Sequence, residues 1–224
     1  MKVVAVIPAF NEQETIAKVV PDSKRFVDEV VVVDDGSTDE TFREAQEAHV
    51  VRHQVKRGKG DALRTGFAEA LRKGAEIIVT LDADGQHDPR EIPKIIQPVL
   101  DGRADLVVGR REGALMFFSR RLSNTLCSSM LTLFGLELYD TQCGFRAYSR
   151  QAVLLLLQRS KKEGYIAETE FLVEAKKFDL EILDVPIRTI QPSKSSIRAV
   201  RDTAQFLSFI LRKLFASLRL KLEG

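Results

Sequence analysis

Acidic and amide side chains gather in residues 81–89, LDADGQHDP, directly after the apolar run EIIVT. Asp82, Asp84 and Gln86 follow one another at every second position. Oxygen ligands of this kind suit a hard divalent cation such as Mg²⁺ or Mn²⁺, which takes carboxylates together with substrate phosphates and water. An isolated pair of aspartates is more often a solvated turn, because Asp and Gly favour turns. The positions of the other acidic residues decide between these two interpretations.

The elements that would position these side chains alternate along the first 110 residues. Apolar runs predict strands over residues 3–7, 29–33, 49–53, 76–81 and 105–108. Helical patterns separate them over residues 12–19, 39–48, 61–73 and 90–100. Continuously apolar strands that alternate with helices are typical of a parallel sheet covered on both faces. Ligands of such α/β sheets bind at the carboxyl ends of the strands.

Three predicted strands carry acidic residues to that edge of the sheet. Asp34 and Asp35 end the second strand. Asp82 and Asp84 follow the fourth strand, and Glu12 follows the first. We therefore expect these carboxylates to line one shared pocket, which favours a metal and nucleotide site over a solvated turn.

The pattern changes after residue 110. Residues 115–138 and 166–178 are predicted as helices, residues 140–150 as a turn and a short strand, and residues 181–190 as a strand that contains Pro186. Residues 197–222 predict a basic helix with one apolar stripe, which either lies on an anionic membrane surface or packs on the domain or a partner chain. We expect one domain over residues 1–196 and this helix over residues 197–224.

The composition fits a globular protein with a sizeable core, since 44% of the 224 residues are hydrophobic and 29% are charged. The formal net charge of +2 gives no indication of a nucleic-acid partner. Cys127 and Cys143 form no disulfide framework, so a cytoplasmic protein is expected. No segment offers the ~18 uncharged apolar residues of a membrane-spanning helix, so any membrane contact would be peripheral.

Five segments occur in the order VIPAFNEQETI, VVVDDGSTDET, RGKGDALRTG, LDADGQHDPREIP and DTQCGFRAY. In this order they resemble family 2 glycosyltransferases of the GT-A fold, and most closely the polyprenyl-phosphate sugar synthases, with the dolichyl-phosphate mannose synthases as their type. The resemblance extends from Val4 to about Lys194. It implies an α/β fold and a metal-dependent, inverting transfer of a sugar from a nucleotide-diphosphate sugar, with GDP-mannose favoured, to a dolichyl or polyprenyl phosphate. A UDP-glucose or UDP-N-acetylglucosamine donor, or a glycan hydroxyl as acceptor, is the alternative.

The same resemblance implies roles for individual residues. It places these residues around the donor: Pro8, Phe10, Glu12, Val33, Asp35, Asp82, Arg111 and Lys194. It assigns Mg²⁺ or Mn²⁺ to Asp82, Asp84 and Gln86.

Catalysis and acceptor binding are assigned in the same way. Asp84 and Arg111 match the residues that help to stabilise the leaving diphosphate. Arg121 and Ser123 match residues that face the acceptor phosphate, with Arg120 as the alternative arginine because the alignment shifts by one residue there.

Several other residues have two interpretations. Glu168 and Glu170 could supply a general base, or they could be an acidic pair favoured at a helix N-terminus, with equal weight. His49 and His53 are predicted as partly exposed strand residues, and His87 as a solvated turn residue. The GKG of residues 58–60 lacks the spacing of a P-loop, although a helix that begins after it could face the donor.

Three other function classes fit less well. A signalling receiver domain also gathers aspartates at parallel strand ends, but it is shorter and places its acidic pair after the first strand. A nucleotidyltransferase would need a glycine-rich loop near the N-terminus, and PAFNEQE contains no glycine. A non-catalytic binder of sugar nucleotides is disfavoured by the presence of Asp82, Asp84, Gln86 and Arg111.

Overall fold

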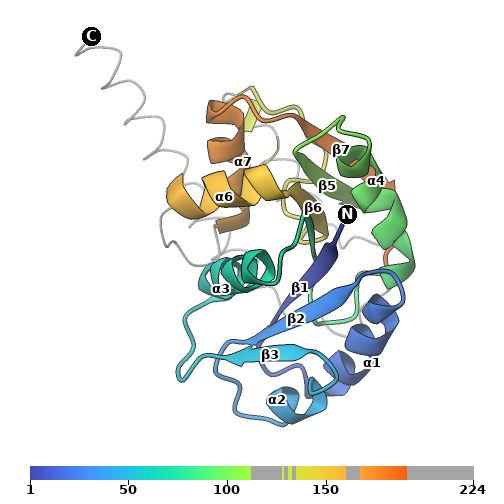
Figure 1. The fold of residues 1–224 in the computed structure, drawn as a ribbon, viewed down its shortest axis with the longest axis vertical. Helices are drawn as coiled ribbons and strands as arrows, with labels where there is room; N and C mark the ends of the chain where they lie inside the picture. The colour runs from blue at the N-terminus through green and yellow to red at the C-terminus, as the bar shows by residue number, and fades with distance from the viewer. Residues whose placement is uncertain (112–127, 129–130, 133–134, 160–166, 191–224) are drawn as a thin grey trace, which may run out of the picture.

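The computed structural model describes residues 1–111, 128, 131–132, 135–159 and 167–190 (Figure 1). These residues form a seven-stranded sheet in the order β3-β2-β1-β4-β6-β5-β7. Its strands are β1 (Val3–Ala9), β2 (Glu29–Asp34), β3 (His49–Arg52), β4 (Ile77–Thr80), β5 (Leu106–Arg111), β6 (Arg146–Ser149) and β7 (Ile182–Ile187). Within the described sheet, β6 is antiparallel to both of its neighbours, and the remaining neighbours pair in parallel. The structure confirms the predicted mainly parallel sheet.

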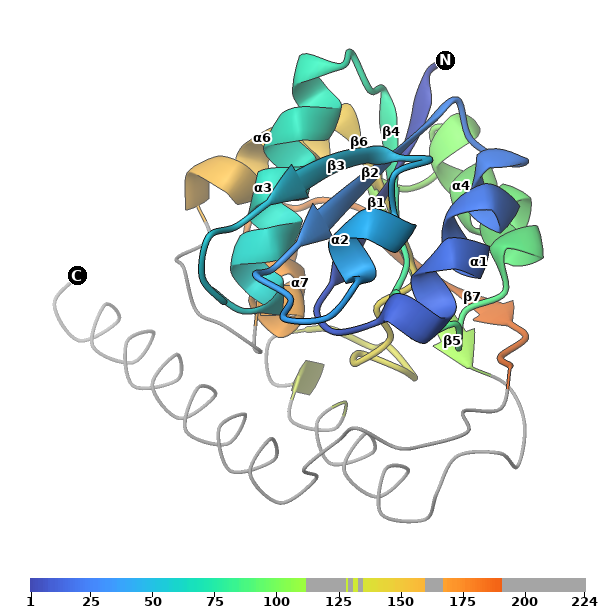
Figure 2. The same ribbon diagram turned by 90° about the horizontal axis from the view of Figure 1, so that it is seen from below.

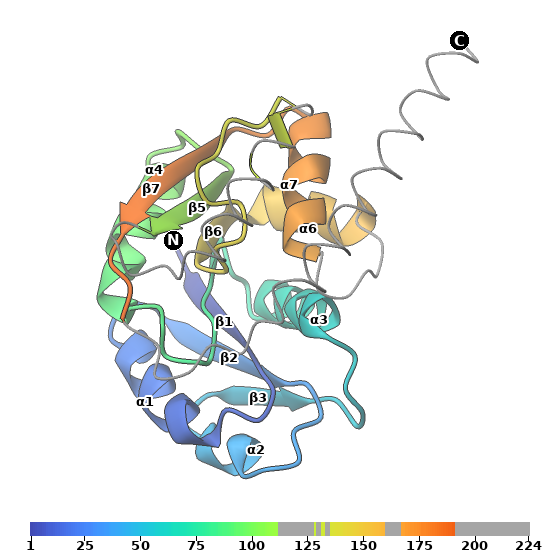
Figure 3. The ribbon, with the colours of Figure 1, turned by 180° about the vertical axis from the view of Figure 1, so that it is seen from behind.

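Helices cover both faces of this sheet. They are α1 (Gln13–Lys24), α2 (Thr41–Glu44), α3 (Lys59–Arg72), the 3₁₀ helix η1 (Pro89–Glu91), α4 (Ile92–Leu100), α6 (Arg150–Arg159) and α7 (Ala167–Lys177). Figure 2 shows α3, α6 and α7 on one face and α1 and α4 on the other. Seen from behind, β6 and β5 lie side by side, and α6 packs against α7 (Figure 3). The helices of the described residues include none with the length and hydrophobicity of a membrane span.

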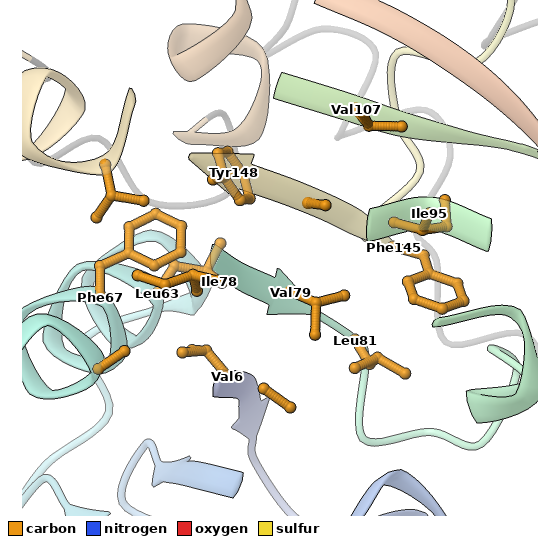
Figure 4. Packing of buried hydrophobic residues seen from close by; sticks show 14 of the residues in the cluster. Val6, Leu63, Phe67, Ile78, Val79, Leu81, Ile95, Val107, Phe145 and Tyr148 are labelled. Atoms are coloured by element: carbon orange, nitrogen blue, oxygen red, sulfur yellow. The ribbon is translucent and has the colours of Figure 1, made fainter. Parts of the chain in front are cut away.

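The core forms because the central strands are apolar on both sides. Every residue of β4 is buried, and Val3 to Ile7 of β1 are buried as well. On the face of α3, the Phe67 ring contacts Tyr148 edge-on at 5.1 Å between centroids (Figure 4). A side chain in place of Gly66 would collide with Val6, so this glycine lets α3 approach β1 closely. The rigid sheet fixes the strand ends that carry the acidic residues.

Two of the predicted helices need correction. The helix predicted over residues 39–48 is only Thr41–Glu44, because its sequence offers no long apolar stripe to bury and a short helix without one is marginal. The helix predicted over residues 115–138 does not extend to residue 138, since Gly135 has φ +72° and ends it. Most of that segment and the helix predicted over residues 197–222 lie outside the described residues. Helix α6 was not predicted, although Ala152, Val153 and Leu156 repeat at helical spacing.

Candidate active site

A pocket of about 400 Å³ lies at the carboxyl ends of β1, β2 and β4. Sequence elements far apart in the chain supply its walls. They are the segments after β1 and β2, the N-terminus of α3, the segment after β4, and single residues of the loop before β6 and of α7. The pocket brings together the following predicted site residues: Pro8, Phe10, Glu12, Asp35, Asp82, Asp84 and Gln86.

The turn after β2 directs its two aspartates in different directions. Asp34 is buried, and its Oδ1 accepts a hydrogen bond from the Ser37 N–H at 2.9 Å. Asp35 lines the pocket and accepts hydrogen bonds from the backbone of Arg57 and Gly58 at 2.9 and 2.7 Å. Gly36, at φ +75°, lies so close to the backbone of residues 55–56 that a Cβ would come within 2.8 Å of it. The turn after β2 is therefore both hydrogen-bonded to and packed against the segment that leads into α3.

Lys59, the first residue of α3, lies between two carboxylates of the pocket. Its Nζ donates to Asp82 Oδ1 and lies 3.1 Å from Glu168 Oε1. Burial alone would lower the pKa of Lys59, but Asp82 and Glu168 outweigh it and raise that pKa. Burial likewise opposes ionisation of Asp82, yet Lys59 holds its pKa well below the usual range. Lys59 and Asp82 are therefore both charged at neutral pH.

Gly144 makes room for this ion pair. A Cβ at this position would lie 2.7 and 2.8 Å from the two carboxylate oxygens of Asp82 and 2.8 Å from Lys59 Nζ. Because Gly144 has no side chain, the backbone of the segment QCGFR packs directly against the ion pair of Asp82 and Lys59. Its Gln142 side chain also lines the pocket.

The other acidic residues of the pocket lie close enough to affect one another. The backbone and side-chain N–H groups of Gln86 donate to Asp84 at 3.0 and 2.6 Å. Burial, together with the negative charge of Asp84 and Asp82, raises the pKa of Glu12 to about 7. A cation beside these groups would relieve the repulsion that raises this pKa.

The donor set fits a hard divalent ion that is shared with a substrate. In the described part of the chain, no group of three or more His, Cys, Asp or Glu side chains converges as a complete metal site. Mg²⁺ is commonly held by a small number of carboxylates plus substrate phosphates, so the pair Asp82 and Asp84 with the Gln86 amide suits it. The chemistry of these residues therefore agrees with a metal that binds together with a diphosphate.

Both histidines that were predicted as exposed or solvated near this site are buried. His87 is 4% exposed, and its Nδ1 accepts a hydrogen bond from the Asp82 N–H at 3.1 Å. Burial lowers the pKa of His87 to about 4, so the ring is neutral and can accept this bond. His53 is 5% exposed and bonds to Asp35 and Thr65. His49 remains partly exposed, as predicted, and pairs with Glu69.

Two of the predicted donor residues do not line the pocket. Arg111 forms a bidentate ion pair with Asp140, in which Nε lies 2.6 Å from Oδ2 and Nη2 lies 2.8 Å from Oδ1. It is close enough to help lower the pKa of Asp82. Val33 is fully buried in β2. The remaining predicted residues lie outside the described residues: Arg120, Arg121, Ser123 and Lys194.

Other pocket residues were missed or left open at the sequence level. Lys59 belongs to the GKG segment, which was considered as a P-loop and as a helix start, and its side chain was given no role. Lys56 was not singled out, and its Nζ lies 3.4 Å from the centroid of the Phe10 ring. Glu168 lines the pocket, whereas Glu170 is buried and does not line it. The structure thus separates two glutamates that the sequence left equivalent.

Comparisons with known proteins agree with this arrangement. Residues 4–154 match the sequence profile of the family described as glycosyl transferase family 2. The chain is 33% identical to the UDP-N-acetylglucosamine–dolichyl-phosphate N-acetylglucosaminyltransferase of Methanococcus voltae, over 91% of this chain and 92% of that relative. It is 31% identical to the polyprenol monophosphomannose synthase of Mycolicibacterium smegmatis, over 90% of this chain and 83% of that relative.

A solved structure shows the same fold. It is glucosyl-3-phosphoglycerate synthase from Mycobacterium tuberculosis in complex with Mn²⁺ and UDP-glucose. The TM-score is 0.77 at 25% identity, over 94% of this chain and 78% of that chain. Three findings agree: the strand order with its acidic strand ends, the family match over residues 4–154, and the similarity to these relatives and to this solved structure. The chain therefore belongs to glycosyltransferase family 2 and has its GT-A fold.

Proposed function

We propose that this glycosyltransferase transfers a hexose from a nucleotide-diphosphate sugar to a polyprenyl or dolichyl phosphate, with inversion at the anomeric carbon. One observation carries the proposal. Glu168, the glutamate that lines the pocket, pairs with Lys59 and is therefore not assigned as the general base that a hydroxyl acceptor would need. The printed names of the relatives from M. voltae and M. smegmatis, which include dolichyl phosphate and polyprenol phosphomannose, support the acceptor class.

The donor half of the proposal rests on the acidic pocket. Asp82, Asp84 and Gln86 would hold Mg²⁺ or Mn²⁺, and the ion supplies positive charge to the leaving diphosphate. Lys59 lies at the same wall and can donate to phosphate oxygens. Arg111 and Lys194 are proposed to add positive charge there. GDP-mannose is the favoured donor, and UDP-N-acetylglucosamine is the alternative that the name of the M. voltae relative provides.

The proposed acceptor, a lipid phosphate, can attack without a general base. A hydroxyl acceptor must lose its proton as it attacks, so it requires a general base. A lipid phosphate is already an anion and requires cationic groups, for which Arg120 or Arg121 with Ser123 are proposed. Glu168 forms an ion pair with Lys59, and Glu170 does not line the pocket. We therefore assign neither glutamate as a general base.

Glu168→Gln is expected to reduce sugar transfer to a polyprenyl phosphate by less than about tenfold, because the amide oxygen still accepts from Lys59. Transfer is measured with labelled GDP-mannose and UDP-N-acetylglucosamine, each with Mn²⁺, and nucleotide binding is followed by calorimetry. Glu170→Gln makes the same chemical change outside the pocket and is the matched control. A loss of 10²–10⁴-fold in Glu168→Gln alone, with nucleotide binding unchanged, would identify a general base and replace the lipid phosphate by a hydroxyl acceptor.

We also propose that residues 197–224 bind the cytoplasmic face of a membrane. Their basic residues are Arg198, Arg201, Arg212, Lys213, Arg219 and Lys221, against Asp202 and Glu223. Each basic residue near an anionic surface gains up to ~1 kcal/mol, so removal of this segment should weaken binding to anionic vesicles at least about tenfold. Co-sedimentation of full-length protein and a chain ending at residue 196 measures this. Equal binding of the two proteins contradicts the proposal, and neutral vesicles are the control.

A further inference from the structure

We propose that His53 is a positioning residue of the donor site, which holds the Asp35 carboxylate in the orientation that binds the nucleoside. The inference rests on the proposed function, since it takes the pocket to be occupied by a nucleotide. It concerns a side chain that lies behind the pocket wall and does not line the pocket.

The His53 ring is fixed on both of its nitrogens. Its backbone N–H donates to the Asp34 carbonyl at 2.8 Å, directly after β3. Nδ1 lies 2.8 Å from Asp35 Oδ1, and Nε2 lies 3.0 Å from Thr65 Oγ1 on α3. The Asp35 carboxylate already accepts two backbone N–H bonds, so Nδ1 is assigned as the donor to Oδ1, and Nε2 bonds to the Thr65 hydroxyl. The ring therefore connects the turn after β2 to the middle of α3.

The hydrogen bonds of Asp35 show what this contact does. Oδ1 accepts from His53 and from the Arg57 N–H, and Oδ2 accepts from the Gly58 N–H. A carboxylate has about four lone-pair sites, so the described residues take three of them. Asp35 lines the pocket, and its fourth site, on Oδ2, suits one N–H or O–H donor of a nucleoside. His53 supplies the bond that keeps this carboxylate from rotating.

A rotation of Asp35 would not stay local. The same carboxylate holds the backbone of Arg57 and Gly58, and the next residue, Lys59, pairs with Asp82. The turn at Gly36 also packs directly against the backbone of residues 55–56, which lead to Arg57. Loss of the Nδ1 bond should therefore weaken nucleotide binding while the buried sheet remains intact.

Two substitutions of His53 distinguish the roles of its two ring nitrogens. The amide nitrogen of Asn takes the place of Nδ1, and the amide nitrogen of Gln takes the place of Nε2. His53→Asn keeps the bond to Asp35, so the dissociation constant for UDP or GDP with Mn²⁺ should stay within about threefold of wild type. His53→Gln loses that bond, and the dissociation constant should rise by about tenfold or more. Calorimetry measures both.

Inorganic pyrophosphate with Mn²⁺ serves as a probe that has no nucleoside. Asp35 is assigned to the nucleoside and reaches the phosphate site only indirectly, through the segment that leads to Lys59. The dissociation constant for pyrophosphate should therefore stay within about threefold of wild type in both His53 variants, well below the nucleotide effect of His53→Gln. Parallel losses of nucleotide and pyrophosphate affinity would show a general disturbance of the pocket and overturn the inference. Equal nucleotide affinity of the Asn and Gln variants would overturn it as well.

A second variant keeps the inference testable if His53→Gln does not fold. Thr65→Val removes only the bond to Nε2, and nucleotide affinity should fall by no more than about threefold; a tenfold fall would assign the effect to Thr65 and contradict the role of Nδ1. The proposed function fails in a different way, since wild-type protein that binds neither UDP nor GDP in the presence of Mn²⁺ has no nucleotide site for His53 to position.

Discussion

Asp84→Asn is expected to lower the rate of sugar transfer by about a thousandfold. The Asp84 carboxylate lies in the pocket with Asp82 and raises the pKa of Glu12, so its charge is part of the field that attracts a cation. A divalent ion contributes several kcal/mol to a transition state in which negative charge grows on the leaving group. Loss of about 4 kcal/mol of that stabilisation corresponds to the stated factor. The asparagine is nearly isosteric, so the fold should not change.

Transfer rate and Mn²⁺ binding in the presence of UDP or GDP are the two measurements for this variant. Asp88→Asn is the matched control, because Asp88 follows on the same loop, caps η1 by accepting from the Arg90 N–H, and does not line the pocket. Its transfer rate should stay within about threefold of wild type. Wild-type activity of Asp84→Asn, or full activity of chelator-treated protein, would show that the pocket does not work through a metal.

The sequence predicted the part of the fold that depends on local patterns. Apolar runs gave the parallel strands, and acidic residues directly after three of them gave the pocket, since parallel strands end at one edge of the sheet. The antiparallel β6 was predicted only as a short strand. Its place between β4 and β5 depends on pairing with residues about 40 and 70 positions away, which no local pattern records.

The side chains that were misjudged depend on distant partners. Lys59 looked like part of an incomplete phosphate loop because its partners Asp82 and Glu168 lie far along the chain. His53 and His87 looked exposed because polar residues surround them in sequence, whereas each ring is buried by contacts across the fold. A polar residue that is buried by tertiary contacts has no periodic signal in the sequence.

Arg146→Met is expected to lower the free energy of unfolding by about 3 kcal/mol or more. Arg146 is fully buried, and its guanidinium donates to three backbone carbonyls, those of Thr141 at 2.7 Å, Cys143 at 2.8 Å and Glu168 at 2.7 Å. Each buried carbonyl that loses its partner costs about 1–3 kcal/mol. Removal of the buried charge offsets part of this loss, which is why the expected value is near the lower end of the sum.

The expected fall in melting temperature is roughly 6–12 °C for a domain of this size, followed by circular dichroism. Arg150→Met is the matched control, because the exposed Arg150 also donates to one backbone carbonyl, that of Ala75, but water can replace its guanidinium there. That variant should lose less than about 1 kcal/mol.

Arg146→Met should also reduce activity at temperatures where it remains folded. The carbonyls that Arg146 holds belong to Thr141, which precedes the pocket residue Gln142, and to Glu168, which pairs with Lys59. The guanidinium therefore joins the loop before β6 to the start of α7 and fixes two walls of the pocket. Without it, the Lys59 contact to Glu168 loses its fixed geometry, and the Michaelis constant for the donor should rise. A variant with wild-type stability and an unchanged Michaelis constant would show that the loop and α7 are held by other contacts.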